Sequence, residues 1–358
     1  MFSLRNDPRC LLRVLALVLA SVLNSFLAIL EDVYLRLIGV DIDQIELPDD
    51  VIFIVGHPRT GTTLLHTMMA LDEDRLCCVR TLDVMTPSSP ILVRRFLSPR
   101  LLRVLEKFML PSTRPMDRLP LAFESPQEAE LATNCISGGA SPYAALSYMT
   151  NFQRYLDMLS FENAPPSEFA AWEAAFKRFL RKMVYLHPSK RLVLKSPCHT
   201  ARLDILRKMF PRSRFVWIHR DPIDVIHSAL FMADRFFPCC FLTMPSVEQV
   251  LEYTLVQHEM IYKSLFDSSV YRSRDLVEVR FDQLDCSTSG ALDVLRDVYT
   301  ALDISDPPVR RVESFLDDLL IVQGFKKNQP VGWGAAVEDE IARRTKSVRT
   351  QLGYHAVL

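Results

Sequence analysis

The chain has 358 residues, of which 49% are hydrophobic, so it is long enough to bury one large core or two smaller ones, and disorder of the whole chain is excluded. Its formal net charge of -1 argues against a general nucleic-acid binder, because affinity for the phosphate backbone needs an excess of basic residues. The eight cysteines show no CxxC spacing and no cluster of metal-ligand residues stands out, so we expect no metal site.

An apolar segment near the N-terminus is the first element to interpret. Val14–Leu30 is an uncharged run of 17 residues preceded by arginines, which is typical of a membrane anchor, although about 20 residues are needed to span a bilayer core. We predict an N-terminal apolar or amphipathic helix within residues 1–45, with residues 10–38 as its membrane contact. Polar and small residues fall on one face of this helix at three- and four-residue spacing: Arg13, Ser21, Asn24, Ser25, Ala28, Glu31 and Asp32.

Two locations of the protein are compatible with this helix. If the helix spans a membrane or lies on it, the protein is membrane-associated, and a Golgi single-pass arrangement with a cytoplasmic N-terminus is one form of this. If the helix packs on its own domain, we expect a cytoplasmic protein. The acidic stretch from Asp41 to Asp50 separates the helix from the main domain, which we place at residues 46–358.

The next stretch predicts a strand, an anion-binding loop and a helix. Val51–Val55 is an apolar run of strand length, a turn follows at Gly56, and helical apolar spacing begins at Thr62. Gly56 and Gly61 have the spacing of the phosphate loop GxxxxGK[ST], in which backbone N–H groups and a helix N-terminus surround an anion. Thr62 replaces the lysine of that loop, and the cation is instead Arg59, whose guanidinium can bind oxyanions through paired hydrogen bonds.

A long segment without strand patterns follows. Residues 80–90 predict a loop at the edge of the sheet. Residues from about 91 to 175 show helical apolar spacing interrupted by turns rich in proline and glycine. Such an insertion between the strands of an α/β enzyme commonly builds the acceptor pocket.

Strands and helices alternate again after residue 190. Arg191–Lys195 predicts a strand, a helix follows from about Thr200 to Met209, and Arg214–Ile218 predicts another strand. Strands separated by helices of this length imply parallel β-α-β units with right-handed crossovers. We therefore predict an α/β fold with a central parallel sheet.

Three basic residues lie just beyond predicted strand ends: Arg59, Lys195 and Arg220. Ligands of parallel sheets bind at the carboxyl ends of the strands. Three cations at one edge of the sheet predict an anionic ligand there.

Two motifs resemble the sulfotransferase superfamily, whose members use 3′-phosphoadenosine 5′-phosphosulfate (PAPS) as sulfuryl donor. PRTGTT at residues 58–63 resembles the family's 5′-phosphosulfate loop, and SRFVWIHRDPIDVIHSAL at residues 213–230 resembles its 3′-phosphate segment, in which an arginine and a serine eight residues later hold the 3′-phosphate. The resemblance covers roughly residues 50–354 and implies a three-layer sandwich of the P-loop-NTPase-like type. The donor-binding residues that it implies are Arg59, Thr60, Gly61, Thr62, Thr63, Arg220 and Ser228.

Lys195, in LVLKSPCHT, matches the family's lysine that contacts the sulfuryl group and the oxygen it leaves. In-line transfer through a loose transition state builds charge on the leaving phosphate oxygen, and fixed cations stabilise that charge. The resemblance implies no metal cofactor. It implies an acceptor hydroxyl on a small molecule, lipid, glycan or protein, and neither the acceptor nor the oligomeric state can be read from the sequence.

The acceptor loses a proton as it attacks, so a general base is expected. Three residues are candidates, in the order Asp83, Glu128 and His57. Asp83 stands where some relatives show glutamate, although it is shorter by a methylene, and Glu128 lies in FESPQEAEL, which resembles an acidic stretch of bacterial and algal members. His57 lies inside the loop, where it could equally tune the anion site.

The C-terminal third contains weaker matches to the family. Val277–Ser287 resembles the family's later strand and turn, and a helix is predicted from about Gly290 to Leu302. Lys326 and Lys327 fall where relatives supply further contacts to the 3′-phosphate. Two other functions stay open: a nucleotide or small-molecule kinase with a degenerate loop, and a membrane-attached relative that has lost turnover.

Overall fold

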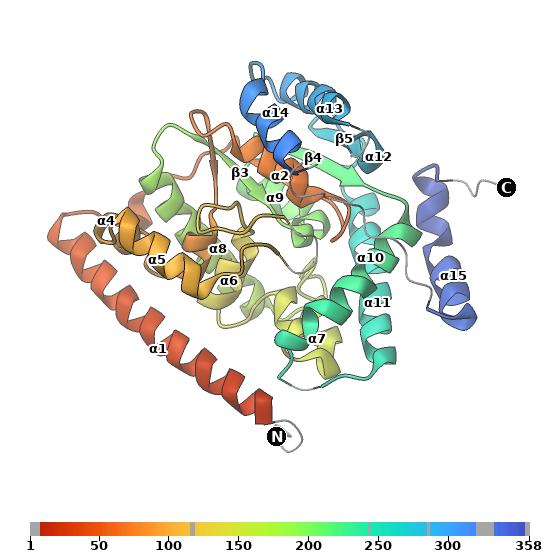
Figure 1. The fold of residues 1–358 in the computed structure, drawn as a ribbon, viewed down its shortest axis with the longest axis horizontal. Coiled ribbons are helices and arrows are strands. Elements are labelled where there is room, and N and C mark those ends of the chain that lie inside the picture. Colours follow the sequence, from red (N-terminus) through yellow and green to blue (C-terminus); the bar gives the residue numbers. More distant parts are fainter. Residues whose placement is uncertain (1–7, 115–118, 243, 285–286, 320–332, 355–358) are drawn as a thin grey trace.

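The computed structural model describes residues 8–114, 119–242, 244–284, 287–319 and 333–354. Five parallel strands form one sheet in the order β2-β3-β1-β4-β5, and helices cover both of its faces (Figure 1). This confirms the predicted α/β fold with a central parallel sheet. The strands are β1 (Ile52–Val55), β2 (Leu76–Cys78), β3 (Arg191–Lys195), β4 (Arg214–His219) and β5 (Leu276–Arg280).

The central strand β1 explains why the sheet has two covered faces. All four of its side chains are buried, as expected for a parallel strand between two helical layers. Phe53 and Val55 point into a cluster with the aromatic residues of α8 (Pro166–Leu186), whereas Ile52 and Ile54 point into a cluster with α2 (Thr62–Ala70). The alternation of side chains along a strand therefore divides the core into two apolar layers.

Most of the helices divide between the two faces of the sheet. Helices α2, α13 and α14 contribute to the core on one face, and α6, α8, α9, α11 and α15 contribute on the other. The remaining helix bounds are α1 (Pro8–Leu37), α3 (Thr81–Met85), α4 (Pro90–Phe96), α5 (Pro99–Met109), α6 (Ala129–Ile136), α7 (Phe152–Leu156), α9 (Leu203–Met209), α10 (Pro222–Arg235), α11 (Val247–Asp267), α12 (Phe281–Leu284), α13 (Thr288–Ala301), α14 (Val309–Asp317) and α15 (Ala335–Gln351). Single 3₁₀ turns occur at Ile42–Gln44, Pro142–Leu146, Met149–Asn151, Pro197–Ala201 and Phe237–Cys239.

The segment between β2 and β3 contains helices α3 to α8, and the structure differs from the sequence prediction in three local features within and beside it. The predicted loop at residues 80–90 contains α3, because the Asp83 side chain accepts from the Arg80 N–H and so caps the start of the helix. Strand β2 was missed, since a run of three residues is too short to show a period. The helix predicted from Thr200 begins only at Leu203, after the 3₁₀ turn Pro197–Ala201.

Candidate active site

The loop between β1 and α2 depends on two glycines. Gly56 and Gly61 have φ values of 150° and 95°. A Cβ atom on Gly56 would lie 2.3 Å from the carbonyl oxygen of Ile218, and one on Gly61 would lie 2.4 Å from the Phe281 ring. Only glycine fits these two positions, because a side chain would collide with β4 or with the start of α12.

Hydrogen bonds from within and beyond the loop hold it in place. The buried Thr60 hydroxyl donates to the His57 carbonyl at 2.8 Å, and the Gly56 N–H donates to the Thr200 hydroxyl at 2.8 Å. Gly61 forms the N-cap of α2, so the predicted Thr62 and Thr63 occupy its first turn. The loop therefore directs the N-terminus of a helix toward the carboxyl edge of the sheet, where an anion is stabilised.

Arg59 and Ser228 are 169 residues apart in sequence and adjacent in space. The Arg59 Nε donates to the Ser228 hydroxyl oxygen at 3.1 Å, and Arg59 adopts a left-handed φ of 76°. Ser228 lies in α10, whose N-cap Asp221 accepts from the Ile223 N–H and pairs with Arg349 at 2.9 Å. The structure thus brings a residue of the predicted 5′-phosphosulfate loop together with one of the predicted 3′-phosphate segment.

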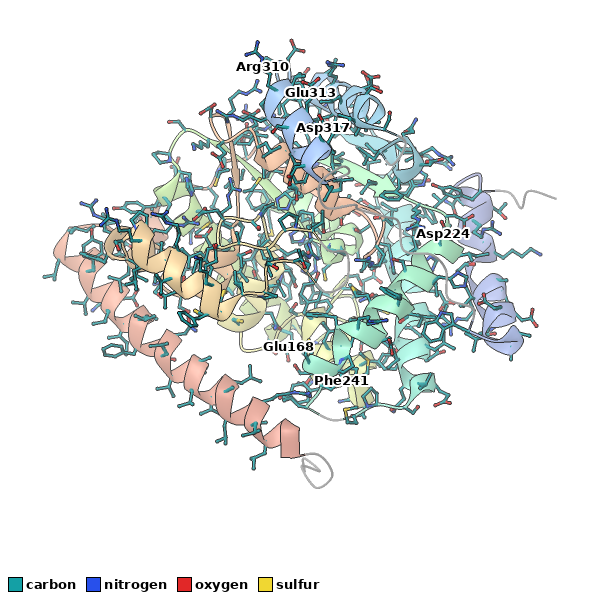
Figure 2. All side chains as sticks on the ribbon, in the orientation of Figure 1. Glu168, Asp224, Phe241, Arg310, Glu313 and Asp317 are labelled. Carbon is teal, nitrogen blue, oxygen red and sulfur yellow. The ribbon has the colours of Figure 1, made fainter. Side chains whose placement is uncertain are left out.

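Arg220 lies just beyond β4 and next to the same loop. Its guanidinium pairs with Asp224 at 2.8 Å and stands over the Phe281 ring, 5.1 Å from the ring centroid (Figure 2 labels Asp224). The same ring packs closely against Gly61, where a Cβ atom would collide with it. One aromatic side chain therefore separates Arg220 from the anion loop.

Lys195 and Glu128 form the charged pair of the site. Lys195 is the last residue of β3, only 2% of its side chain is exposed, and its Nζ donates to Glu128 Oε1 at 2.5 Å and to the Thr63 hydroxyl at 3.4 Å. The second Glu128 oxygen accepts from the hydroxyl of Tyr143. The predicted leaving-group cation, one predicted base and the first turn of α2 thus meet at one point.

Tyr143 was missed by the sequence reasoning. It lies in the 3₁₀ turn Pro142–Leu146 within the insertion, where no motif marks it. Burial, with the adjacent Glu128 charge as a second cause, raises the pKa of Tyr143 well above its ordinary value. The phenol therefore stays protonated and donates its hydrogen bond to Glu128.

The other two base candidates make different contacts. Asp83 is fully buried and both of its oxygens have partners: one pairs with Arg94 of α4 at 2.6 Å, and the other accepts from the Arg80 N–H at the start of α3 at 2.9 Å. His57 packs against the rings of His258 and Tyr262, and burial lowers its pKa to about 4. The structure brings Glu128 to Lys195 and directs these two side chains to other partners.

The acidic neighbours of Glu128 also have structural partners. Glu130 is buried and pairs with Arg202 at 2.8 Å, while the exposed Glu124 pairs with Arg94 at 3.2 Å. No group of three or more His, Cys, Asp or Glu residues within the described ranges is arranged to hold a metal ion. Lys326 and Lys327 lie outside the described residues.

Comparison with known proteins bears on the identity of this site. The profile of the sulfotransferase family matches residues 50–308. The chain belongs to the sulfotransferase family. The omega-hydroxy-beta-dihydromenaquinone-9 sulfotransferase Stf3 of Mycobacterium bovis is 28% identical over 292 residues, which cover 80% of this chain and 70% of the relative, and Stf3 of Mycobacterium tuberculosis matches equally.

Two solved sulfotransferase structures share the fold of this chain. Sulfotransferase STF1 from Mycobacterium tuberculosis superposes with a TM-score of 0.64 at 17% identity, covering 92% of this chain and 83% of that one. Sulfotransferase STF9 from Mycobacterium avium gives a TM-score of 0.62 at 18% identity, with 89% and 80% covered. The protein is therefore a sulfotransferase with the fold of these enzymes, and the kinase interpretation is superseded.

Proposed function

We propose that this sulfotransferase uses PAPS as its donor and transfers the sulfuryl group in line to a hydroxyl. The loop residues Thr60 to Thr63 and the N-terminus of α2 bind the 5′-phosphosulfate, while Arg220 and Ser228 bind the 3′-phosphate. The contact between Arg59 and Ser228 supports one continuous donor site, because it joins the two segments that these phosphates require.

In the proposed mechanism, Lys195 acts on the leaving oxygen and Glu128 acts on the acceptor proton. The acceptor oxygen forms a bond to sulfur as the bond between sulfur and the 5′-phosphate oxygen breaks, and Lys195 stabilises the charge that develops on that leaving oxygen. The acceptor proton passes to Glu128 Oε1, which the bound donor frees by drawing Lys195 toward its own negative charge. Tyr143 holds the other carboxylate oxygen and so keeps the base in place.

We infer that the acceptor hydroxyl belongs to a lipid. The relative Stf3 is named for an omega-hydroxylated dihydromenaquinone acceptor. In the present chain, large apolar side chains are exposed along α1 and α5, which suits an enzyme that meets an apolar acceptor at a membrane.

The test of the donor site is calorimetric titration of the full chain with 3′-phosphoadenosine 5′-phosphate, beside ADP and AMP, without metal. We expect tight binding of the nucleotide with the 3′-phosphate alone, and loss of that preference in the Arg220→Ala variant. Preference for ADP, or for ATP with Mg²⁺, would overturn the proposal. Transfer of labelled sulfate from PAPS to long-chain primary alcohols, compared with short soluble alcohols, then tests the acceptor class.

A further inference from the structure

The exposed large apolar side chains are concentrated in a small part of the molecule. Within the described ranges they occur only in residues 11–38, 96–109 and 244–247. The first two segments comprise α1 and the α4–α5 region, which lie on the same side of the domain in Figure 1. Residues 244–247 follow Phe241, which is labelled beside the N-terminal end of α1 in Figure 2. Apolar surface gathered in this way marks an interaction site.

Helix α1 contacts the domain near both of its ends. The Arg13 guanidinium donates to the Phe241 carbonyl at 2.8 Å, and the buried Glu31 pairs with Lys182 at 2.7 Å and accepts from the Leu92 N–H at 2.8 Å. Arg13 and Glu31 are five helical turns apart and share one face. The helix therefore runs alongside the domain for roughly 27 Å between these contacts, at 1.5 Å per residue, and no residue from Val14 to Leu30 is buried.

The face of α1 that points away from the domain is apolar. Its residues recur at three- and four-residue spacing and are exposed by between 46% and 63%. They are Leu11, Leu15, Val18, Val22, Phe26, Ile29 and Val33. A helix docked on a water-soluble domain buries its apolar face, but α1 turns Arg13 and Glu31 to the domain and this apolar face outward.

Helix α5 presents a second apolar stripe with basic residues next to it. No residue of α5 is buried, and Leu101, Val104 and Phe108 are exposed at helical spacing. Four basic side chains are exposed along α4 and α5, and none of them forms an ion pair within the part of the chain that the structure describes: Arg95, Arg100, Arg103 and Lys107. An apolar stripe flanked by unpaired basic residues suits the interface of an anionic bilayer.

Helices α1 and α4 are in contact, so the apolar face of α1 and the apolar stripe of α5 belong to one surface. The Tyr34 and Phe96 rings meet edge to face, with centroids 5.3 Å apart, at the C-terminal end of α1. Helix α5 begins three residues after Phe96. The apolar surface therefore continues from α1 across Phe96 to α5.

We propose that α1 and the α4–α5 region form a single membrane-binding surface on which the enzyme lies at an anionic bilayer without crossing it. Leu11–Leu37 is long and apolar enough to span a membrane, but a spanning orientation would break the contacts of Arg13 with Phe241 and require α1 to leave the domain. A second copy of the chain fits this surface less well, because a symmetric pair would place the basic residues of α5 against one another.

Vesicle flotation of the full chain tests the contribution of α5. Wild-type protein should bind vesicles of phosphatidylcholine with phosphatidylglycerol more tightly than phosphatidylcholine alone. The Val104→Glu, Phe108→Glu double variant should lower the partition coefficient about tenfold or more with α1 intact. The control is Thr300→Glu with Ser314→Glu, which adds the same charge at exposed positions of α13 and α14 and should change binding less than about twofold. Equal losses in both variants, or no binding by wild type, would overturn the proposal.

A topology experiment separates lying on the membrane from crossing it. Protease-cleavable tags are placed at both termini, and the protein is reconstituted from detergent into sealed vesicles. If α1 lies in the plane of the interface, external protease removes both tags from a given molecule or neither. Removal of one tag only would show a spanning helix, and a dimer that dissociates in the α5 variant would instead assign the surface to a second copy. Neither assay measures sulfuryl transfer, so failure here is distinct from failure of the proposed function.

Discussion

Replacement of Glu128 by glutamine is the sharpest test of the proposed catalytic roles of Lys195 and Glu128. Glutamine keeps the shape of the side chain and can still accept from Tyr143, but it cannot take the acceptor proton. General bases contribute about 100-fold to 10,000-fold, so kcat should fall by about that factor. Lys195 loses the carboxylate that faces it at 2.5 Å, and the negative charge of a bound donor can take the place of that carboxylate. The donor Kd should therefore stay unchanged or fall, while kcat collapses.

The assay is steady-state transfer from labelled PAPS, with the donor Kd measured separately by calorimetry. Glu124→Gln is the matched control. It makes the same chemical change four residues earlier, at a carboxylate whose partner is Arg94 and which contacts neither Lys195 nor Glu128. Because Lys195 is almost fully buried, loss of the carboxylate that faces it should lower the melting temperature of the free variant, and bound nucleotide should restore it. A kcat within threefold of wild type, or a loss confined to donor affinity, would refute the assignment of Glu128 as the base.

Three further predictions concern the donor loop and its surroundings. Lys195→Ala should lower kcat by about 100-fold or more with a much smaller change in donor Kd; equal losses in both would contradict a leaving-group role. Gly61→Ala should abolish nucleotide binding in calorimetry, because its Cβ would lie 2.4 Å from the Phe281 ring at a φ of 95°, and binding near the wild-type level would show that the loop tolerates the collision. Burial lowers the pKa of His57 from 6.5 to about 4. Between these two pH values the histidine is protonated in the unfolded chain and neutral in the folded chain, so the free energy of unfolding decreases as pH falls from 6.5 toward 4. His57→Gln should therefore remove about 2 kcal/mol of the difference in unfolding free energy between pH 7 and pH 5, measured in urea, and an unchanged pH dependence would disprove this.

The sheet was predictable because its central strands are short apolar runs ended by marked turns. Arg191–Lys195 has the predicted bounds, and β4 is longer than predicted by one residue, His219. Helix α10 begins at Pro222, as the Asp-Pro pair indicates. Local sequence determines these features, and parallel pairing then brings Lys195 and the loop after β1 to the same edge.

The position of Glu128 beside Lys195 was not predictable, because it depends on how the chain returns after β2. The Gln127 N–H donates to the Val79 carbonyl at 2.8 Å, which places the next residue, Glu128, beside the carboxyl end of β3. Val79 and Gln127 are 48 residues apart, and no spacing rule encodes that contact. Asp83 is nearer to the loop in sequence, but its two oxygens accept hydrogen bonds from the Arg80 N–H and from the Arg94 guanidinium.

The N-terminal helix shows the same limit of sequence reasoning. Its period reveals a polar face and an apolar face, but the period does not say which face meets the domain. The structure joins the polar face to the domain through Arg13 and Phe241, and Phe241 packs in the apolar cluster that Tyr143 borders. The helix proposed to lie on the membrane and the residue proposed to hold the base are therefore parts of one packed unit.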